Sequence, residues 1–375
     1  MIPHSLLAEI ARKLVILPAV APAAVVATGF RAASRAGFEF AEGAAFNEEG
    51  RHLNTRVFFD LASISKSFVA VTLARLVQRG RLDFETRLQD LLPEARESVT
   101  GSASVLLLLA HRAGLEAHRT LFAPLLSALP FERSTAIRDA LNARRPECLT
   151  PAPAAGHPPL YSDLGFALVG LALERLERLP LDEIVEREVC APLGLSVGSA
   201  RLLRARHDDF LARCMPTETV PFRGGQVQGV VHDENAWALS GHGTSGHAGL
   251  FGTADSVARF GAALLDARGG RSAWLHAKIF APLLEERPGG TLRAGFDGKS
   301  ADQSSAGRLA GGRSFGHLGF TGTSFWCDPD ADRVLVLLTN RVCPTRNNPK
   351  IRAARPAVND ALYALAHAPE NTPQN

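Results

Sequence analysis

The sequence predicts an α/β fold, of the α+β type, in which a sheet domain built from both ends of the chain carries an inserted, mostly helical domain. Two observations lead to this prediction. Short apolar or alternating runs, separated by turns of small residues, are concentrated before about residue 60 and again after residue 313. Helical patterns dominate from residue 63 to about 190. At 375 residues the chain is long enough for two domains, and we expect 1–80 and 240–375 to form the α/β domain and 81–239 the helical one.

The individual elements follow from hydrophobic period and from the residues that interrupt it. We expect an amphipathic helix at 6–14, a buried strand at 23–30 and a second strand at 38–46. A helix beginning at Ser63 is stopped at Gly80, because glycine readily takes the left-handed conformation that ends helices. The remaining expected elements are helices at 163–178, 254–267 and 351–366, and strands at 313–320, 323–329 and 332–340.

Charge and cysteine content exclude several classes of protein. Lys plus Arg number 41 against 38 for Asp plus Glu, a net charge of +3 without a basic cluster, which argues against nucleic acid as a partner. The cysteines are odd in number, widely spaced and never in a C-x-x-C pair. We therefore expect buried free thiols, no structural metal and no cofactor. The five are Cys148, Cys190, Cys214, Cys327 and Cys343.

The N-terminal segment superficially resembles a secretory signal, because Arg12 and Lys13 precede an apolar run. Two prolines interrupt that run, and Glu9 lies before the basic pair. We therefore interpret the segment as part of the folded domain and expect a bacterial cytoplasmic location, with a periplasmic or secreted protein as the alternative. No other apolar run approaches the roughly 20 residues that span a bilayer, so no integral membrane segment is expected.

Ser63 and Lys66 form an S-x-x-K pattern at the start of an expected helix. Residues three apart share a helix face, so the hydroxyl and the amine can come within hydrogen-bonding reach. A serine needs an adjacent base to become a nucleophile, and a desolvated lysine can be that base, whereas arginine does not deprotonate. Only five of the 41 basic residues are lysines. The alternative is that Ser63 caps the helix and Lys66 is solvated.

Two further sequence patterns contain residues that could take part in catalysis or substrate binding. Tyr161-Ser162-Asp163 lies in a Pro/Gly-rich loop before a helix, and the chain has only two tyrosines. A phenol whose pKa is lowered by a neighbouring ammonium can relay a proton. Gly316-His317-Leu318-Gly319 lies on an expected strand edge, where glycine lets the backbone approach a ligand. The alternatives are a loop tyrosine with Asp163 as a helix cap, and an ordinary β-bulge.

In this order, the three patterns SISK, YSD and HLG resemble the motifs S-x-x-K, Y-x-N and K-T-G or H-x-G of the serine β-lactamase-like and penicillin-binding-protein superfamily. That superfamily includes DD-peptidases, class C β-lactamases and related esterases, and the resemblance covers roughly residues 6–365. It implies a five-stranded antiparallel sheet flanked by helices, plus a helical domain, with the active site in the cleft between them.

The resemblance also implies roles for individual residues. Ser63 would be the nucleophile that forms an acyl-enzyme, and Lys66 and Tyr161 would share general-base and general-acid work. The backbone N–H groups of Ser63 and Phe320, the latter directly after Gly319, would form the oxyanion hole.

Two positions depart from the family pattern. His317 stands where many members have lysine, so a fixed positive charge is mostly absent at pH 7. This weakens the case for efficient β-lactamase activity and leaves esterase, amidase or D-amino-acid peptide substrates. Asp163 replaces the usual asparagine and adds a carboxylate that would pair with Lys66 and hold it protonated. Tyr161 then becomes the favoured proton acceptor.

Other motif matches fail on context. The G-x-G-x-x-G of 241–246 has no strand before it and no helix directly after it, which argues against a dinucleotide site. The G-x-S-x-G strings at 194–198 and 312–316 lack the strand, sharp turn and helix of a hydrolase elbow. The acidic run from Asp328 to Asp332 lacks the glycine and glutamate of a calcium loop, so a β-turn is expected.

A polar, Gly-punctuated stretch at 231–249 contains His232, Asp233, Glu234, His242 and His247. Its spacing fits no zinc template. By its position it should lie at the rim of the cleft, and we interpret it as a substrate-shaping loop, with a metal site as the alternative.

The sequence therefore predicts a serine hydrolase that acts through an acyl-enzyme on Ser63 and cleaves a small ester, amide or peptidoglycan-derived substrate. Two alternatives stay open. The chain could be a catalytically silent binding protein of the same fold, or an acyltransferase in which an alcohol or amine replaces water.

Overall fold

The protein was analysed as a computed structural model, which describes residues 2–31, 37–47 and 54–365. Its largest sheet has six antiparallel strands in the order β2-β1-β11-β10-β9-β8. The N-terminal strand β1 pairs directly with β11 near the other end of the chain, with Val26 opposite Leu337. The strands are β1 (Ala23–Arg31), β2 (Phe38–Phe46), β8 (Asp297–Gly298), β9 (Phe315–Leu318), β10 (Ser324–Asp328) and β11 (Arg333–Thr339).

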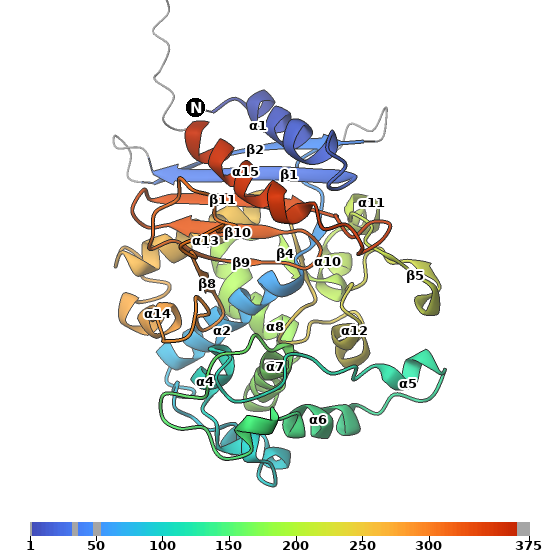
Figure 1. Cartoon of the computed structure of the whole chain (residues 1–375), viewed down its shortest axis with the longest axis vertical. Helices are drawn as coiled ribbons and strands as arrows, with labels where there is room; N and C mark the ends of the chain where they lie inside the picture. Colours follow the sequence, from blue (N-terminus) through green and yellow to red (C-terminus); the bar gives the residue numbers. More distant parts are fainter. Residues whose placement is uncertain (1, 32–36, 48–53, 366–375) are drawn as a thin grey trace, which may run out of the picture.

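Helices cover both faces of this sheet (Figure 1). One face packs against α13 (Ala254–Arg268), and the other against α1 (His4–Ala11) with its following π-helical turn and against α15 (Ile351–Leu365). Along β11, Val336 and Leu338 belong to the core on the α13 side, whereas Leu335 and Leu337 belong to the core under α1 and α15. A strand buried on both faces is apolar at every position, which explains the unbroken run VLVLL in the sequence.

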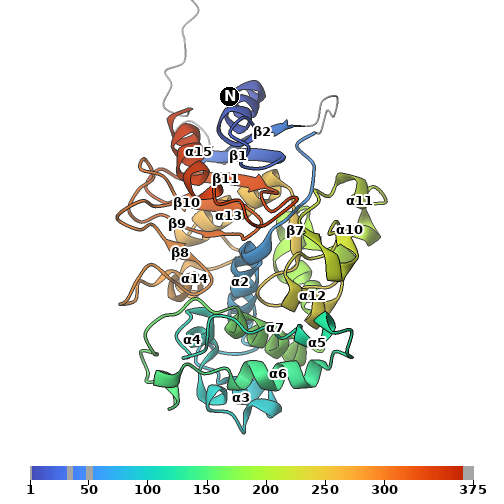
Figure 2. The same ribbon diagram turned by 45° about the vertical axis from the view of Figure 1, so that its right-hand side comes forward.

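The helical region lies below the sheet, with α2 (Ser65–Gln78) running between the two (Figure 2). Gly80 follows this helix at φ 68°, as expected for the residue that ends it. The other helices are α3 (Leu88–Leu91), α4 (Val105–Leu109), α5 (Ala123–Leu126), α6 (Arg133–Asn142), α7 (Asp163–Glu177), α8 (Leu181–Val185), α9 (Ala191–Leu193), α10 (Ala200–Arg206), α11 (Phe210–Arg213), α12 (Glu234–Ser240) and α14 (Ala277–Leu284).

The strand count differs from the expected five in the main sheet, because β8 adds a sixth strand of two residues. Short strands also occur outside it: a three-stranded sheet of β3 (Phe59–Asp60), β7 (Leu250–Gly252) and β4 (Val197–Ser199), and the pair β5 (Thr219–Val220) and β6 (Gly225–Gln226). Strands of two or three residues are too short to show an alternating pattern. The domain boundaries expected near residues 80 and 240 remain a prediction from the sequence.

Other expectations from the sequence can be compared directly. The segment expected as a helix at 6–14 is helical and packs on β2, with Leu7 and Ala11 fully buried, and Val15 directly after it is fully buried too. None of the helices in the described ranges has the length and apolarity needed to cross a bilayer. Four cysteines are buried free thiols, whereas Cys343 is only half-buried.

The contact between α1 and β2 depends on Gly43. A Cβ atom at this position would lie 2.2 Å from the backbone nitrogen of Ala8. We predict that Gly43→Ala lowers the free energy of unfolding by about 1–3 kcal/mol, because the helix has to move away from the sheet. Gly37→Ala is the control, since a Cβ there meets no atom of the described residues within 4 Å. Urea unfolding of both variants checks this, and equal stability of the two would contradict it.

Candidate active site

Ser63 lies in a short 3₁₀ turn, Ala62–Ile64, between β3 and α2. Ala62 has a positive φ of 47°, a conformation that is strained for a residue with a side chain. The buried carboxylate of Asp60 holds this turn, because its two oxygens accept from the backbone N–H of Ala62 at 2.8 Å and of His232 at 2.6 Å. The strained turn brings the half-buried Ser63 to a cleft at the start of the helix.

Lys66, on the first turn of α2, is fully buried. Its Nζ donates to three acceptors: Ser63 Oγ at 2.9 Å, Asp163 Oδ1 at 2.7 Å and the backbone oxygen of His247 at 3.1 Å. An ammonium group has three N–H donors, so each of them has a partner. The structure thus brings together Ser63, Lys66 and Asp163 from two distant parts of the sequence.

The charges of Lys66 and Asp163 stabilise each other. Burial alone would lower the pKa of Lys66, but the charge and hydrogen bond of Asp163 raise it above its usual value. Burial likewise acts to raise the pKa of Asp163, and the Lys66 ammonium holds it well below its usual range. The pair is therefore ionised at neutral pH, and Lys66 donates to the Ser63 hydroxyl rather than accepting its proton. This is the state expected from Asp163 in place of asparagine.

Tyr161 precedes α7 and lies beside the lysine, with Lys66 Nζ 4.9 Å from the centre of its ring. The expectation that the ammonium lowers the pKa of this phenol is wrong in its net direction. Burial raises the pKa of Tyr161 and is the largest influence, while the charge of Lys66 and hydrogen bonding to Lys66 and Ser63 oppose it only in part. Tyr161 is therefore a neutral phenol in the resting protein.

His111 was not singled out by the sequence, yet it holds the tyrosine loop in place. Its ring stacks on Tyr161 with the centroids 4.7 Å apart, and its Nδ1 accepts from the backbone N–H of Ser162 at 3.0 Å. Burial, together with the charge of Lys66, lowers the pKa of His111 to about 3, so the ring is neutral. The only signal in the sequence was a histidine directly after an apolar run.

His317 lies on β9 with its ring 6.1 Å from that of Tyr161. Its Nδ1 is 2.8 Å from the backbone oxygen of Leu318. Burial is the main reason that the pKa of His317 is lowered to about 3, and the nearby Lys66 ammonium adds to it. The side chain is buried and is not among the residues that line the cleft, whereas Leu318, Gly319 and Phe320 are. His317 therefore supplies no positive charge at neutral pH.

The two N–H groups expected to form an oxyanion hole are available. Within the described ranges, neither Ser63 nor Phe320 donates its backbone N–H to a protein acceptor, and both residues border the cleft. Gly319 between β9 and Phe320 cannot be replaced without a shift, because a Cβ there would lie 1.9 Å from Thr323 Oγ1 and 2.6 Å from the backbone oxygen of Leu61. The close packing against Leu61 brings this loop next to the turn that carries Ser63.

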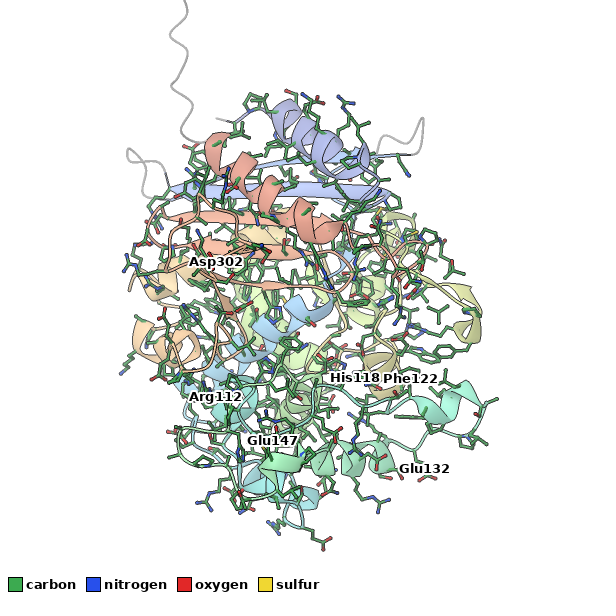
Figure 3. The ribbon with its side chains drawn as sticks, viewed as in Figure 1. Arg112, His118, Phe122, Glu132, Glu147 and Asp302 are labelled. Carbon is green, nitrogen blue, oxygen red and sulfur yellow. The ribbon has the colours of Figure 1, made fainter. Side chains whose placement is uncertain are left out.

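The cleft itself is a cavity of about 830 Å³, within the size range of small-molecule sites. Ser63 and Phe320 line one side, and Tyr161 and Asp163 line the side that belongs to the helical region. The segment with His118 and Phe122, labelled in Figure 3, adds to that wall near α12. His118 Nδ1 lies 3.7 Å from Asp163 Oδ2, so Asp163 connects the buried lysine to a side chain that is half exposed in the cleft.

The stretch 231–249 contributes His232, Asp233 and Glu234 to the cleft lining. Its acidic groups are paired separately: Asp233 with His247 at 2.9 Å, and Glu234 with Arg346. His242 lines a different depression beside Asp182. In the described part of the chain no three metal-type side chains gather.

Gly246, the last glycine of the 241–246 motif, has a packing role. A Cβ on Gly246 would lie 1.7 Å from the backbone oxygen of Phe166, so only glycine lets this loop press against α7. The next residue is His247, whose carbonyl accepts from Lys66. The close approach therefore supplies the third acceptor for the buried ammonium.

A family model described as Beta-lactamase matches residues 7–359, and the chain belongs to this family of serine hydrolases. Among curated relatives, an N-acetylmuramyl-L-alanine amidase of Bacillus subtilis (strain 168) is 29% identical over 337 residues, which cover 83% of this chain and 75% of that protein. A putative D-alanyl-D-alanine carboxypeptidase of Salmonella agona is 27% identical over 317 residues, covering 79% and 72%.

Among solved structures, EstCE1, described as a hydrolase with promiscuous acyltransferase activity, matches with a TM-score of 0.69. The match is 19% identical and covers 96% of this chain and 99% of that one. At this identity it supports the fold, an antiparallel sheet with helices on both faces.

Asp163 should control the protonation state of Lys66. We predict that Asp163→Asn lowers the pKa of Lys66, because burial remains while the opposite charge is lost, so that neutral lysine becomes available as a base. The rise of p-nitrophenyl ester hydrolysis with pH should then move down by about one pH unit or more. Asp255→Asn, a change of the same charge on the surface of α13, serves as control. A pH profile that does not move would contradict the assignment.

Proposed function

We propose that the protein hydrolyses a small amide or ester, of the kind found in peptidoglycan fragments, through an acyl-enzyme on Ser63. The observation that carries this proposal is the distance of 2.9 Å between Lys66 Nζ and Ser63 Oγ, in a cleft bordered by two backbone N–H groups that have no acceptor among the described residues. The names of the relatives, an amidase of N-acetylmuramyl-L-alanine and a putative D-alanyl-D-alanine carboxypeptidase, support this class of substrate.

In the first step, Ser63 Oγ bonds to the substrate carbonyl carbon and loses its proton. We propose that Tyr161, in its deprotonated phenolate form, accepts this proton, because Lys66 is already protonated and cannot. The Lys66 ammonium, fixed by Asp163, stabilises the phenolate charge. The carbonyl oxygen becomes an oxyanion at the N–H groups of Ser63 and Phe320. When the carbonyl re-forms, the bond to the leaving group breaks, and Tyr161 returns the proton to that group.

The acyl-enzyme is then cleaved by water along the reverse path. Water bonds to the acyl carbon as its proton passes to Tyr161, and Ser63 leaves and takes that proton back. An alcohol or amine in place of water would give acyl transfer with the same residues. The products formed with and without an added alcohol therefore distinguish the two reactions.

The location in the cell is part of the proposal. We propose a cytoplasmic protein, whose substrates would be fragments of cell wall rather than the intact polymer. The burial of Leu7, Ala11 and Val15 supports the interpretation of this N-terminal segment as part of the folded domain.

Ser63 should be the site of covalent modification. We predict a mass increase on treatment with an activated ester or penicillin, and none in Ser63→Ala, whose turnover should fall roughly a thousandfold or more. Substrates for the assay are p-nitrophenyl esters, a chromogenic cephalosporin, an N-acetylmuramyl-L-alanine amide and a D-Ala-D-Ala peptide. Equal labelling of the variant would contradict the proposal. Binding of substrate without labelling of the native protein would indicate a silent binding protein instead.

Tyr161 should be the proton carrier. We predict that Tyr161→Phe lowers kcat about a hundredfold or more, because a general acid–base group typically contributes that much. In the native protein kcat should rise with pH into the alkaline range, since burial raises the pKa of Tyr161 above that of an ordinary tyrosine and only the phenolate accepts the proton. A pH–rate profile that is flat above neutral pH, or a kcat unaffected by the substitution, would exclude this role.

A further inference from the structure

Two of the residues that line the cleft, Arg341 and Arg355, are largely buried arginines. Arg355 on α15 is 8% exposed and Arg341, after β11, is 9% exposed. Within the described ranges neither has a carboxylate within 4.0 Å, and the Nε of Arg355 has no hydrogen-bond partner. The acidic side chains that line the same cleft are each paired with another residue. Burying a cation without a nearby opposite charge costs free energy, so these arginines are expected to have a specific role.

Both arginines hold the loop that follows β9. Arg355 Nη2 donates to the backbone oxygens of Gly319 at 2.7 Å and Thr323 at 2.9 Å. Arg341 Nε donates to the backbone oxygen of Phe320 at 2.9 Å. Two further carbonyls of the loop also accept hydrogen bonds. The backbone N–H of Arg341 donates to the oxygen of Thr321, and Thr339 Oγ1 donates to the oxygen of Gly322.

The bond to Gly319 has a particular consequence, because its C=O and the N–H of Phe320 belong to the same peptide unit. In a trans peptide these two groups point in opposite directions. A guanidinium on the oxygen side, aided by the N–H of Gly322 at 3.0 Å, therefore directs the Phe320 N–H away from α15. That N–H borders the cleft and has no protein acceptor in the described part of the chain.

We propose that Arg355 is a positioning residue of the oxyanion hole, which it orients and polarises through the Gly319–Phe320 peptide. This inference rests on the proposed function of Ser63. A cation on the carbonyl oxygen draws electron density from the peptide nitrogen and makes its N–H a stronger donor. The guanidinium also lies behind the peptide as an unneutralised positive charge. The acidic side chains of the cleft do not cancel its attraction for a developing oxyanion, because each of them is paired with another residue.

The competing explanation is that Arg355 merely ties α15 to the sheet. Arg333 provides a matched control for this role, because it is also buried, lacks a carboxylate within 4.0 Å in the described ranges and has an unpartnered Nε. Its Nη1 donates to the backbone oxygen of Tyr363, so it ties α15 to β11 at a site away from the loop. Loss of either arginine removes a hydrogen bond between α15 and the sheet domain. Of the two, only Arg355 donates to the Gly319–Phe320 peptide, which carries one N–H group of the proposed oxyanion hole.

The test compares Arg355→Met, Arg355→Lys and Arg333→Met with the native enzyme, after the reactive Ser63 has been titrated so that only folded protein is counted. We expect Arg355→Met to lower kcat for a p-nitrophenyl ester roughly tenfold or more with little change in KM. Its affinity for phenylboronic acid, which forms a negatively charged tetrahedral adduct with Ser63, should fall by a similar factor. Arg355→Lys keeps the charge and should recover part of both, and Arg333→Met should change only the thermal midpoint of unfolding.

Several results would overturn the proposal. The first is that kcat and boronate affinity of Arg355→Met stay within about twofold of the native values. The second is that Arg355→Met changes only KM. The third is that Arg333→Met loses as much kcat and boronate affinity as Arg355→Met does. If Arg355→Met does not fold, Arg355→Lys against the native enzyme decides, because loss of the planar fork should still lower kcat and boronate affinity together. Failure of the proposed function looks different, since native protein would then not be labelled on Ser63 at all.

Discussion

The buried ion pair between Lys66 and Asp163 is the interaction on which the geometry of the cleft depends. Taking two charges out of water costs several kcal/mol per ion, and the cost is offset only where every donor finds a partner. The ammonium has three acceptors, and each comes from a different segment: the turn before α2, the start of α7 and the loop before β7. A shift of any one segment would leave a buried charge unsatisfied. The pair therefore acts as a constraint on the positions of all three.

The same principle applies at the opposite wall of the cleft, where buried cations again donate to oxygen acceptors. There the loop after β9 presents backbone oxygens, and buried guanidinium groups satisfy them. Threonine hydroxyls complete the arrangement, since Thr321 and Thr323 donate to the backbone oxygens of Asp60 and Leu61, shortly before Ser63. The Phe320 N–H is thus oriented by hydrogen bonds to the oxygen of its own peptide, and the threonines connect this loop to the segment that leads to Ser63.

Much of this site could be predicted from local sequence, and the rest could not for physical reasons. The spacing of Ser63 and Lys66, and the carboxylate of Asp163 close to a tyrosine, are short-range patterns with a direct chemical meaning. The long strands and helices follow from hydrophobic period, whereas β8 is too short to have one. His111 and Arg355 act on residues 50 and 36 positions away, through contacts that exist only after folding. The raised pKa of Tyr161 was also missed, because burial outweighs the neighbouring charge.

The pairing of β1 with β11 has a consequence for how the protein is made. Strand β1 has two neighbours in the sheet. β2 is synthesised directly after it, whereas β11 is synthesised about 300 residues later. Such distant pairings make folding slow, because a long loop must close before any contact is gained. Ser63 leaves the ribosome early, whereas Arg355 leaves it late. A nascent chain therefore carries Ser63 long before it carries Arg355, so the arrangement that we propose for catalysis is complete only after β11 and α15 have joined the sheet.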